Sequence, residues 1–417
     1  MKSFHFFVLL VLLSICGCQI LLPSFPDTIN EKLEGSSAKC GDIDRDWNET
    51  GDIVVILSLS GGGKRAAAFS YGVLLGLEKI ELEFPSGRKT NLLQEVNFIS
   101  AVSGGATMAA FYTLNKSSPE RFHRFTEFLY DDSELALTLR SIYPSNWFTS
   151  SAVIEAKYFR DILFDNSTFS DLPKWPFLVI GATDLTRGMQ FNFTEAQFRC
   201  IGSDIGKYPL SYAVAASAAY PIFFGTIPLK NFNYPPDSSA MSLNREKGRF
   251  VNLSDGGLVD NLAIRPYLQL LEKGFLIGNP QGKPRKLSKG LIYIRVDGSA
   301  PLTPQFEHSS QSPGLLSRLE RAFGVALEQQ VQGSLSNLVV RYTDLLDQWG
   351  VQYVLFRVGL KEEDVPKEIK ERPGFIPTRW TLSDEDIRLL VDAGQKMILS
   401  KTREIKKAQA LFLEKAP

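Results

Sequence analysis

The sequence predicts an α/β fold with a mostly parallel central sheet that is covered by helices on both faces. Short apolar runs rich in β-branched residues recur along the chain, and segments with helical periodicity lie between them. Apolar runs of this kind suit strands that are buried on both faces. Strands that alternate with helices are typical of a parallel sheet. The 417 residues suffice for one large domain, and no internal repeat or composition break demands a second.

Two strand–turn–helix units open this pattern. Residues 53–57 are predicted as a buried strand, and glycines then separate it from a helix over 64–80 that has one apolar face. Residues 96–102 form the next predicted strand, and a helix rich in small residues follows at 106–114. Further strands are predicted at 177–182, 250–253, 291–296 and 351–358, and further helices at 210–219, 261–273 and 314–347.

Capping residues predict two more helices. Ser118, followed by proline, is typical of a helix start, and Ser383 with Asp386 forms a capping box for a last helix. The stretches 230–249 and 277–289 contain few apolar residues, so we expect them to be surface excursions.

The first 17 residues have the composition of a signal peptide. Lys2 provides a positive start, and the apolar run over 4–15 is shorter than the roughly 20 residues that a spanning helix needs. The run ends in a segment that resembles the bacterial lipoprotein box, with small Gly17 before Cys18. This resemblance implies cleavage before Cys18 and several acyl chains on it, which give lasting membrane attachment. An ordinary cleaved signal or a short uncleaved anchor is the alternative.

The N-terminal sequence therefore predicts an exported, membrane-anchored lipoprotein. Residues 18–50 would be a lipidated tether and residues 51–417 the folded domain. Gln19 is not the aspartate that retains lipoproteins in the inner membrane, which favours the outer membrane. After processing, Cys40 and Cys200 would be the remaining thiols, and an oxidising compartment allows them to form a disulfide.

Charge and composition limit the partners. Lys plus Arg equals Asp plus Glu, at 46 each, which argues against a nucleic acid held by charge alone. Asp42, Asp44 and Asp46 alternate as in a calcium loop, but Trp47 and Ile53 stand where an EF-hand needs glycine and an acidic ligand. We interpret them as a solvated acidic turn and predict no metal or cofactor.

Three glycines follow the first predicted strand. Gly61, Gly62 and Gly63 allow a tight turn that points several N–H groups outward, and the helix behind them adds partial positive charge. Such a loop can hold a phosphate or a developing oxyanion. A plain strand–helix turn is the alternative interpretation.

A serine follows the second predicted strand. Ser103, with Gly104 and Gly105 after it, has the small neighbours of a nucleophile elbow, although Ala101 replaces the usual first glycine. Gly104 would supply an oxyanion N–H directly after the nucleophile. A short Ser/Gly turn without chemistry is the alternative.

A serine nucleophile needs a base, and the chain has only three histidines. His5 lies in the signal segment, His123 in a predicted amphipathic helix and His308 in a polar loop. Asp255, which precedes two glycines at the end of a predicted strand, is therefore a candidate carboxylate base. The same pattern also occurs in ordinary turns.

The glycine loop, the Ser103 elbow and the Asp255 turn occur in the order and contexts of the patatin-like phospholipase family. The segments 181–185, 215–224 and 376–378 resemble further family motifs, so the resemblance extends from about residue 53 to 400. It implies the three-layer patatin-like fold.

The resemblance also implies the residue roles. Ser103 would be the nucleophile and Asp255 its base, and the glycine loop with Gly104 would hold the oxyanion. The implied activity is hydrolysis of fatty acyl esters through an acyl-enzyme, without a cofactor. Lys64 and Arg65 would contact an anionic head group, or would be solvated charges at a helix start.

Two alternatives remain at this stage. An α/β-hydrolase-type esterase would use a triad of Ser103, either Asp255 or Asp297, and His308. A non-catalytic lipoprotein would use the glycine loop to bind an anion.

Overall fold

The computed structural model describes residues 28–35, 40, 53–118, 122–143, 146, 149–221, 224–234, 248–272, 290–299, 314–348, 351–370 and 376–414. The chain divides into two compact units, each made of discontinuous segments. Unit 1 comprises Met1–Asp44, Ala110–Leu172 and Ile180–Gly256, and unit 2 comprises Arg45–Ala109, Pro173–Val179 and Gly257–Pro417. The signal segment, with Cys18, lies outside the described residues.

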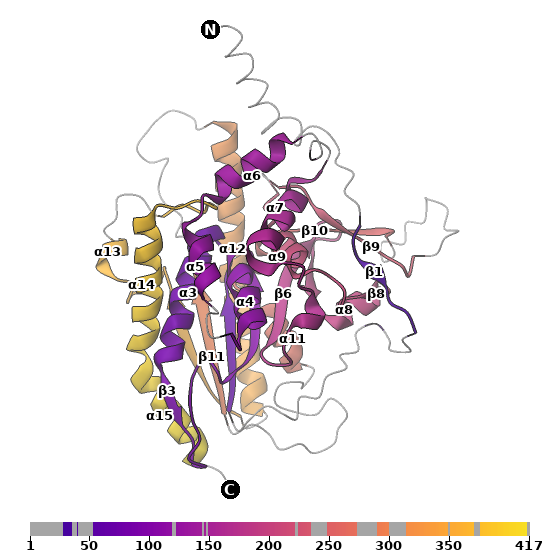
Figure 1. The fold of residues 1–417 in the computed structure, drawn as a ribbon. Coiled ribbons are helices and arrows are strands. Elements are labelled where there is room, and N and C mark those ends of the chain that lie inside the picture. Colours follow the sequence, from indigo (N-terminus) through magenta and orange to yellow (C-terminus); the bar gives the residue numbers. More distant parts are fainter. Residues whose placement is uncertain are drawn as a thin grey trace. The chain divides into compact units, whose positions relative to one another are not determined.

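Unit 2 contains a run of parallel strands (Figure 1). In order they are β12 (Gln352–Gly359), β11 (Gly290–Asp297), β2 (Ile53–Leu59) and β5 (Val96–Val102). Every residue of β2 and β11 is buried, as expected for parallel strands covered on both faces. The prediction of an α/β fold with parallel strands is confirmed.

The helices of unit 2 follow these strands in the chain. They are α3 (Gly63–Lys79), the start of α4 (Gly104–Asn115), α10 (Gly257–Asp260), α11 (Arg265–Glu272), α12 (Leu315–Gln348), α13 (Lys367–Lys370), α14 (Asp384–Ser400) and α15 (Thr402–Glu414). Figure 1 draws α3 and α14 side by side in front of the strands and α12 fainter behind them.

Three predicted helices differ at their starts. α11 begins at Arg265 rather than at 261, because Asp260 accepts the Arg265 N–H (2.7 Å) and Ala263 takes a positive φ of 54°. The helix predicted from Ser118 begins at His123, as α5. α4 begins directly after Ser103, two residues earlier than predicted.

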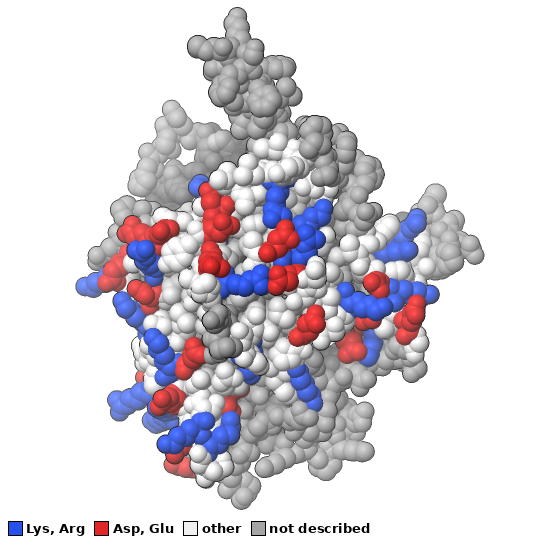
Figure 2. All heavy atoms as spheres, in the orientation of Figure 1, with Lys and Arg blue, Asp and Glu red and all other residues white. Residues whose placement is uncertain are grey.

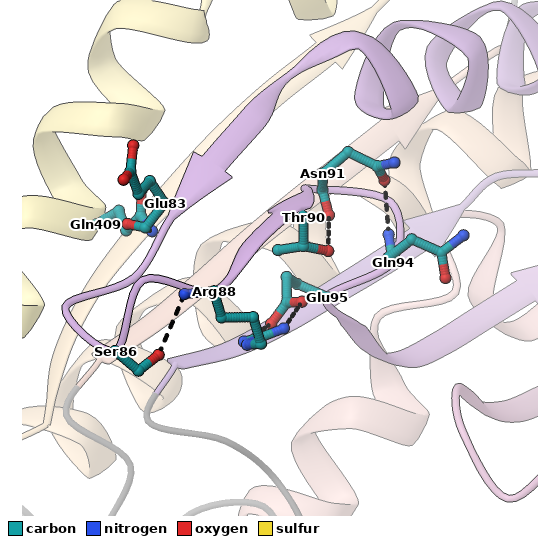
Figure 3. A network of polar contacts seen from close by, with 8 residues as sticks. All are labelled: Glu83, Ser86, Arg88, Thr90, Asn91, Gln94, Glu95 and Gln409. Atoms are coloured by element: carbon teal, nitrogen blue, oxygen red, sulfur yellow. Dashed lines mark hydrogen bonds and ion pairs between the residues drawn. The ribbon is translucent and has the colours of Figure 1, made fainter.

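A short hairpin joins α3 to β5 in unit 2. It pairs β3 (Glu81–Glu83) with β4 (Lys89–Asn91), and Figure 3 shows its polar contacts. Arg88 makes two hydrogen bonds to the Glu95 carboxylate, of 2.6 and 2.9 Å, and Gln409 of α15 donates to the Glu83 carbonyl (3.1 Å). The hairpin is thereby fixed at the edge of the unit.

Unit 1 is built on antiparallel pairs. β6 (Phe177–Asp184) starts in unit 2 and continues here, where it pairs with β7 (Met189–Phe193) and β10 (Phe250–Ser254), and β10 pairs with β9 (Ile227–Lys230). The full strand order is β12-β11-β2-β5-β6-β10-β9, with β7 on β6. The mostly parallel central sheet is therefore mixed.

Short helices accompany these strands in unit 1. They are α5 (His123–Tyr130), α6 (Ser133–Ile142), α7 (Ser151–Phe159), the π-helix η3 (Arg160–Phe164), the 3₁₀-helix η4 (Phe169–Asp171), α8 (Glu195–Cys200) and α9 (Leu210–Ala218). Phe191, Phe193, Phe198 and Tyr208 pack as an aromatic cluster, with ring centroids 5.3–6.0 Å apart.

Part of the predicted tether is a docked strand rather than irregular chain. β1 (Glu31–Lys32) pairs with β8 (Ser203–Asp204) in an antiparallel ladder, and Asn30 bonds Ser203 and Lys230. Because this ladder joins residues far apart in sequence, local composition did not predict it.

Lys and Arg side chains are interspersed with Asp and Glu over the described part of the face in Figure 2. Ion pairs among the described residues include Arg124–Asp165 and Arg140–Asp161, both at 2.8 Å. The part of this face that the structure describes carries no large field of one sign.

Candidate active site

The glycine loop follows the carboxyl end of β2 and begins α3. Gly62 has a φ of 139° and Gly63 a φ of 60°, conformations that residues with a Cβ rarely adopt. The Gly61 N–H donates to the Asn261 carbonyl (3.0 Å) and the Ser60 N–H to the Val296 carbonyl (3.0 Å). Glycine is therefore required by the turn itself.

This loop presents backbone donors at the start of a 17-residue helix. Within the described residues, the N–H groups of Gly62 and Gly63 have no hydrogen-bond acceptor. A helix N-terminus adds partial positive charge at such donors. The arrangement is suited to an anion or to a developing oxyanion.

Ser103 stands in the sharp turn between β5 and α4. Its φ is 53°, which is uncommon for a residue other than glycine and costs backbone strain. A strained serine between a strand and a helix is the geometry of a nucleophile elbow. The turn forms although Ala101, fully buried in β5, replaces the first glycine. Ser103 itself is 7% exposed.

The loop and the elbow touch through their backbones. A Cβ on Gly104 would lie 1.9 Å from the Gly63 carbonyl oxygen, and one on Gly105 would lie 2.5 Å from that of Ser60. A Cβ on Gly61 would lie 3.3 Å from Ser103 Cβ. Unit 2 therefore brings together the predicted nucleophile and every predicted oxyanion residue.

Asp255 lies in unit 1 at the end of β10, and its backbone is held on two sides. Its N–H donates to the Ala219 carbonyl (2.9 Å), and its carbonyl accepts from Thr183 Oγ1 (2.8 Å). Next to it, Gly256 donates to the Ser217 carbonyl (3.1 Å). The residue is 8% exposed. The structure thus joins three predicted motif segments around Asp255, while its pairing with Ser103 stays a prediction.

A model of the patatin-like phospholipase family matches residues 57–268 of the chain, which is just over half of its length and includes the glycine loop, Ser103 and Asp255. The chain belongs to the patatin-like phospholipase family.

Solved structures are also similar, at low identity. Human GIVD cytosolic phospholipase A2 in complex with methyl gamma-linolenyl fluorophosphonate is 16% identical, with a TM-score of 0.42, and the match covers 89% of this chain and 61% of that one. Human GIVD cytosolic phospholipase A2 alone is 13% identical, with a TM-score of 0.39, and the match covers 89% of this chain and 64% of that one. The chain spans about three fifths of the length of these proteins. No curated protein matches it.

Two cations beside the glycine loop of this patatin-like chain are buried. Lys64 is fully buried and Arg65 is 2% exposed, so the interpretation as solvated charges is wrong. Arg65 donates from Nε to the Gly298 carbonyl (2.8 Å) and from Nη1 to the Ile376 carbonyl (2.9 Å). Burial lowers the pKa of Arg65 to about 10, and nearby Asp297 opposes this, so the guanidinium stays charged at neutral pH. The described hydrogen bonds of Arg65 go to backbone carbonyls, so we assign Arg65 no head-group role.

Cys40 and Cys200 are joined by a disulfide in unit 1. His308 lies outside the described residues, and His123 is exposed on α5, 3.7 Å from Glu127. Within the described ranges, no group of His, Cys, Asp and Glu side chains is arranged to hold a metal ion. No helix in the same ranges is long and apolar enough to cross a membrane.

Asn261 was not predicted as a site residue. Its backbone carbonyl accepts the Gly61 N–H, and its Oδ1 lies 2.5 Å from the position of a Gly61 Cβ. The only available signal was its place six residues after Asp255, in the turn between α10 and α11.

Proposed function

We propose that this chain hydrolyses fatty acyl esters of lipids, with Ser103 as nucleophile and Asp255 as its base. The observation that carries the proposal is the left-handed Ser103, packed against a glycine loop in which the N–H groups of Gly62 and Gly63 lack acceptors among the described residues. Family membership supports a lipid substrate, and the order of the motifs supports the role of Asp255.

In the first half-reaction Ser103 Oγ forms a bond to the ester carbonyl carbon while its proton passes to the Asp255 carboxylate. The carbonyl electrons move onto oxygen, and the N–H groups of Gly62, Gly63 and Gly104 stabilise the resulting charge. Collapse of this intermediate breaks the bond to the alcohol, which leaves with the proton from Asp255. An acyl-enzyme on Ser103 remains.

Water completes the cycle. It gives its proton to Asp255 and attacks the acyl carbon, and the same donors hold the second oxyanion. Collapse releases the fatty acid, and the proton returns to Ser103 Oγ. Each donor removed from such a site costs about 10²–10³-fold in turnover, so the glycine loop contributes substantially beside the dyad.

Turnover of a panel of phospholipid, lysophospholipid, glyceride and simple esters tests this function. S103A and D255N should each lose on the order of 10³-fold or more, whereas the exposed controls S86A and D384N should keep wild-type rates. A fluorophosphonate probe should label wild type but not S103A. Equal turnover in wild type, S103A and D255N defeats the proposal.

The same experiment separates the alternatives. Near-complete loss of turnover in H308A would favour the triad esterase, whereas little loss would favour the dyad. An unlabelled Ser103 together with anion binding at the glycine loop would favour a non-catalytic lipoprotein.

We further propose that the enzyme is exported and anchored in the outer membrane through acylated Cys18. The lipoprotein-box sequence supports this, and the activity would place its substrate in the membrane. Labelled fatty acid should be incorporated into wild type and C16A but not into C18A, and C18A should leave the membrane fraction. Labelling of C18A would contradict the anchor.

A further inference from the structure

Asn261 lies against the glycine loop beside the nucleophile. Its carbonyl accepts the Gly61 N–H (3.0 Å). A Cβ placed on Gly61 would be 2.5 Å from Asn261 Oδ1 and 3.3 Å from Ser103 Cβ. The Asn261 carboxamide and the Ser103 side chain therefore flank the same point, within unit 2.

The segment that carries Asn261 is fixed to β5, the strand that ends directly before Ser103. Ser100 Oγ of β5 donates to the Ala263 carbonyl. Ala263 in turn donates its N–H to the Asp260 carbonyl (3.1 Å), and Asp260 Oδ2 accepts the Arg265 N–H (2.7 Å). These bonds on both sides of Asn261 hold the backbone of the turn in place, so the residue is carried on a fixed turn rather than on a loose loop.

The carboxamide itself is available. Asn261 is half-buried, and among the described residues its carboxamide has no hydrogen-bond partner. Because Oδ1 lies against Gly61, the amide nitrogen offers two N–H groups. A carboxamide is neutral near pH 7, so it can donate to a developing negative charge without exchanging a proton with Ser103.

We propose that the Asn261 carboxamide is a further catalytic hydrogen-bond donor, which contacts the ester oxygen as charge develops during attack by Ser103. The proposal rests on the proposed function and adds a side-chain donor to the backbone donors of the glycine loop. A Cβ on residue 61 would force Oδ1 to move, so glycine at this position leaves room for the carboxamide where it is.

Three variants test this role: N261A, N261D and the control N91D in the β3–β4 hairpin. N261A should lower kcat about 10²-fold, as expected for loss of one donor, with little change in KM. N261D keeps the shape of the side chain but replaces the donor by a negative charge. We expect it to be slower than N261A, because the carboxylate opposes the oxyanion, and its rate should fall further as pH rises through the carboxylate pKa.

A purely structural role predicts the opposite order, with N261D near wild type and N261A slow and thermally less stable. That result, or wild-type kcat in both variants, overturns the proposal. If N261A does not fold, N261D with an unchanged melting temperature still decides the question. Failure here is distinct from failure of the proposed function, because S103A would remain inactive while the Asn261 variants kept full turnover.

Discussion

At the scale of single residues, the contact between Gly104 and Gly63 sets how closely the nucleophile approaches the oxyanion loop. A methyl group on residue 104 would lie 1.9 Å from the Gly63 carbonyl oxygen and 2.7 Å from its carbon. Both atoms belong to the backbone of a turn with its own conformational demands, so neither moves without opening the loop. Glycine at 104 therefore serves the geometry of the site directly.

We predict that G104A lowers both stability and turnover. Overpacking of this kind costs about 1–3 kcal/mol, and a displacement of about 1 Å at a reacting centre can cost 10²-fold in rate. Urea unfolding and ester hydrolysis measure the two effects. G314A is the control, because a Cβ there would meet nothing within 4 Å. Wild-type turnover in G104A would show that the loop and the elbow are not coupled.

Residue-level sequence patterns predicted the elbow but not the state of the cations. Ser103 was predictable because its small neighbours and its place after an apolar run are local features. Arg65 was not, because its carbonyl partners lie 233 and 311 positions away in the sequence. A charge beside a glycine loop looks solvated until the fold supplies those partners. Asn261 was missed for the same reason.

At the scale of elements, α3 and α14 are packed backbone against backbone. A Cβ on Gly72 would lie 2.0 Å from the Val391 carbonyl oxygen, and one on Gly394 would lie 2.3 Å from that of Phe69. Gly76 is equally confined, 2.2 Å from a methyl group of Ile398. Because α3 starts at the glycine loop, this packing also anchors that loop.

The substitution G72A should destabilise the protein although alanine is the better helix former. The added methyl group would collide with the backbone of α14, so we expect the free energy of unfolding to fall by about 1–3 kcal/mol. G333A in α12 is the matched control, because a Cβ there meets nothing within 4 Å. It should gain up to about 1 kcal/mol. Chemical denaturation of both variants checks the prediction, and a gain in both would contradict close packing of α3 on α14.

Elements with strong local signals were predicted well. β2, β5 and β11 are buried apolar runs, and their bounds were correct within two residues. The start of α11 was not predicted, because the hydrogen bond from the Arg265 N–H to the Asp260 side chain and the left-handed Ala263 delay the start of the helix. β10 was also predicted, but β1, β8 and β9 are short and depend on partners elsewhere in the chain, so no window of sequence marks them.

At the scale of the whole molecule, a disulfide and a strand pair join the same two parts of unit 1, the residues before 41 and those around 200–204. Cys40 is bonded to Cys200 across 160 positions, and β1 pairs with β8 just beyond α8. Asn30 adds hydrogen bonds to Ser203 and Lys230. Residues 30–32 and Cys40 are therefore part of the folded unit.

We predict that removing this disulfide destabilises the protein by about 2–4 kcal/mol, chiefly because the unfolded chain regains the freedom of a long loop. The C40S/C200S double variant should unfold at lower urea than wild type. A thiol reductant should lower wild type to the same midpoint and leave the double variant unchanged. Because β1 and Asn30 still hold the segment, ester hydrolysis below the transition should persist. Labelling of both thiols on exported wild type would contradict the link.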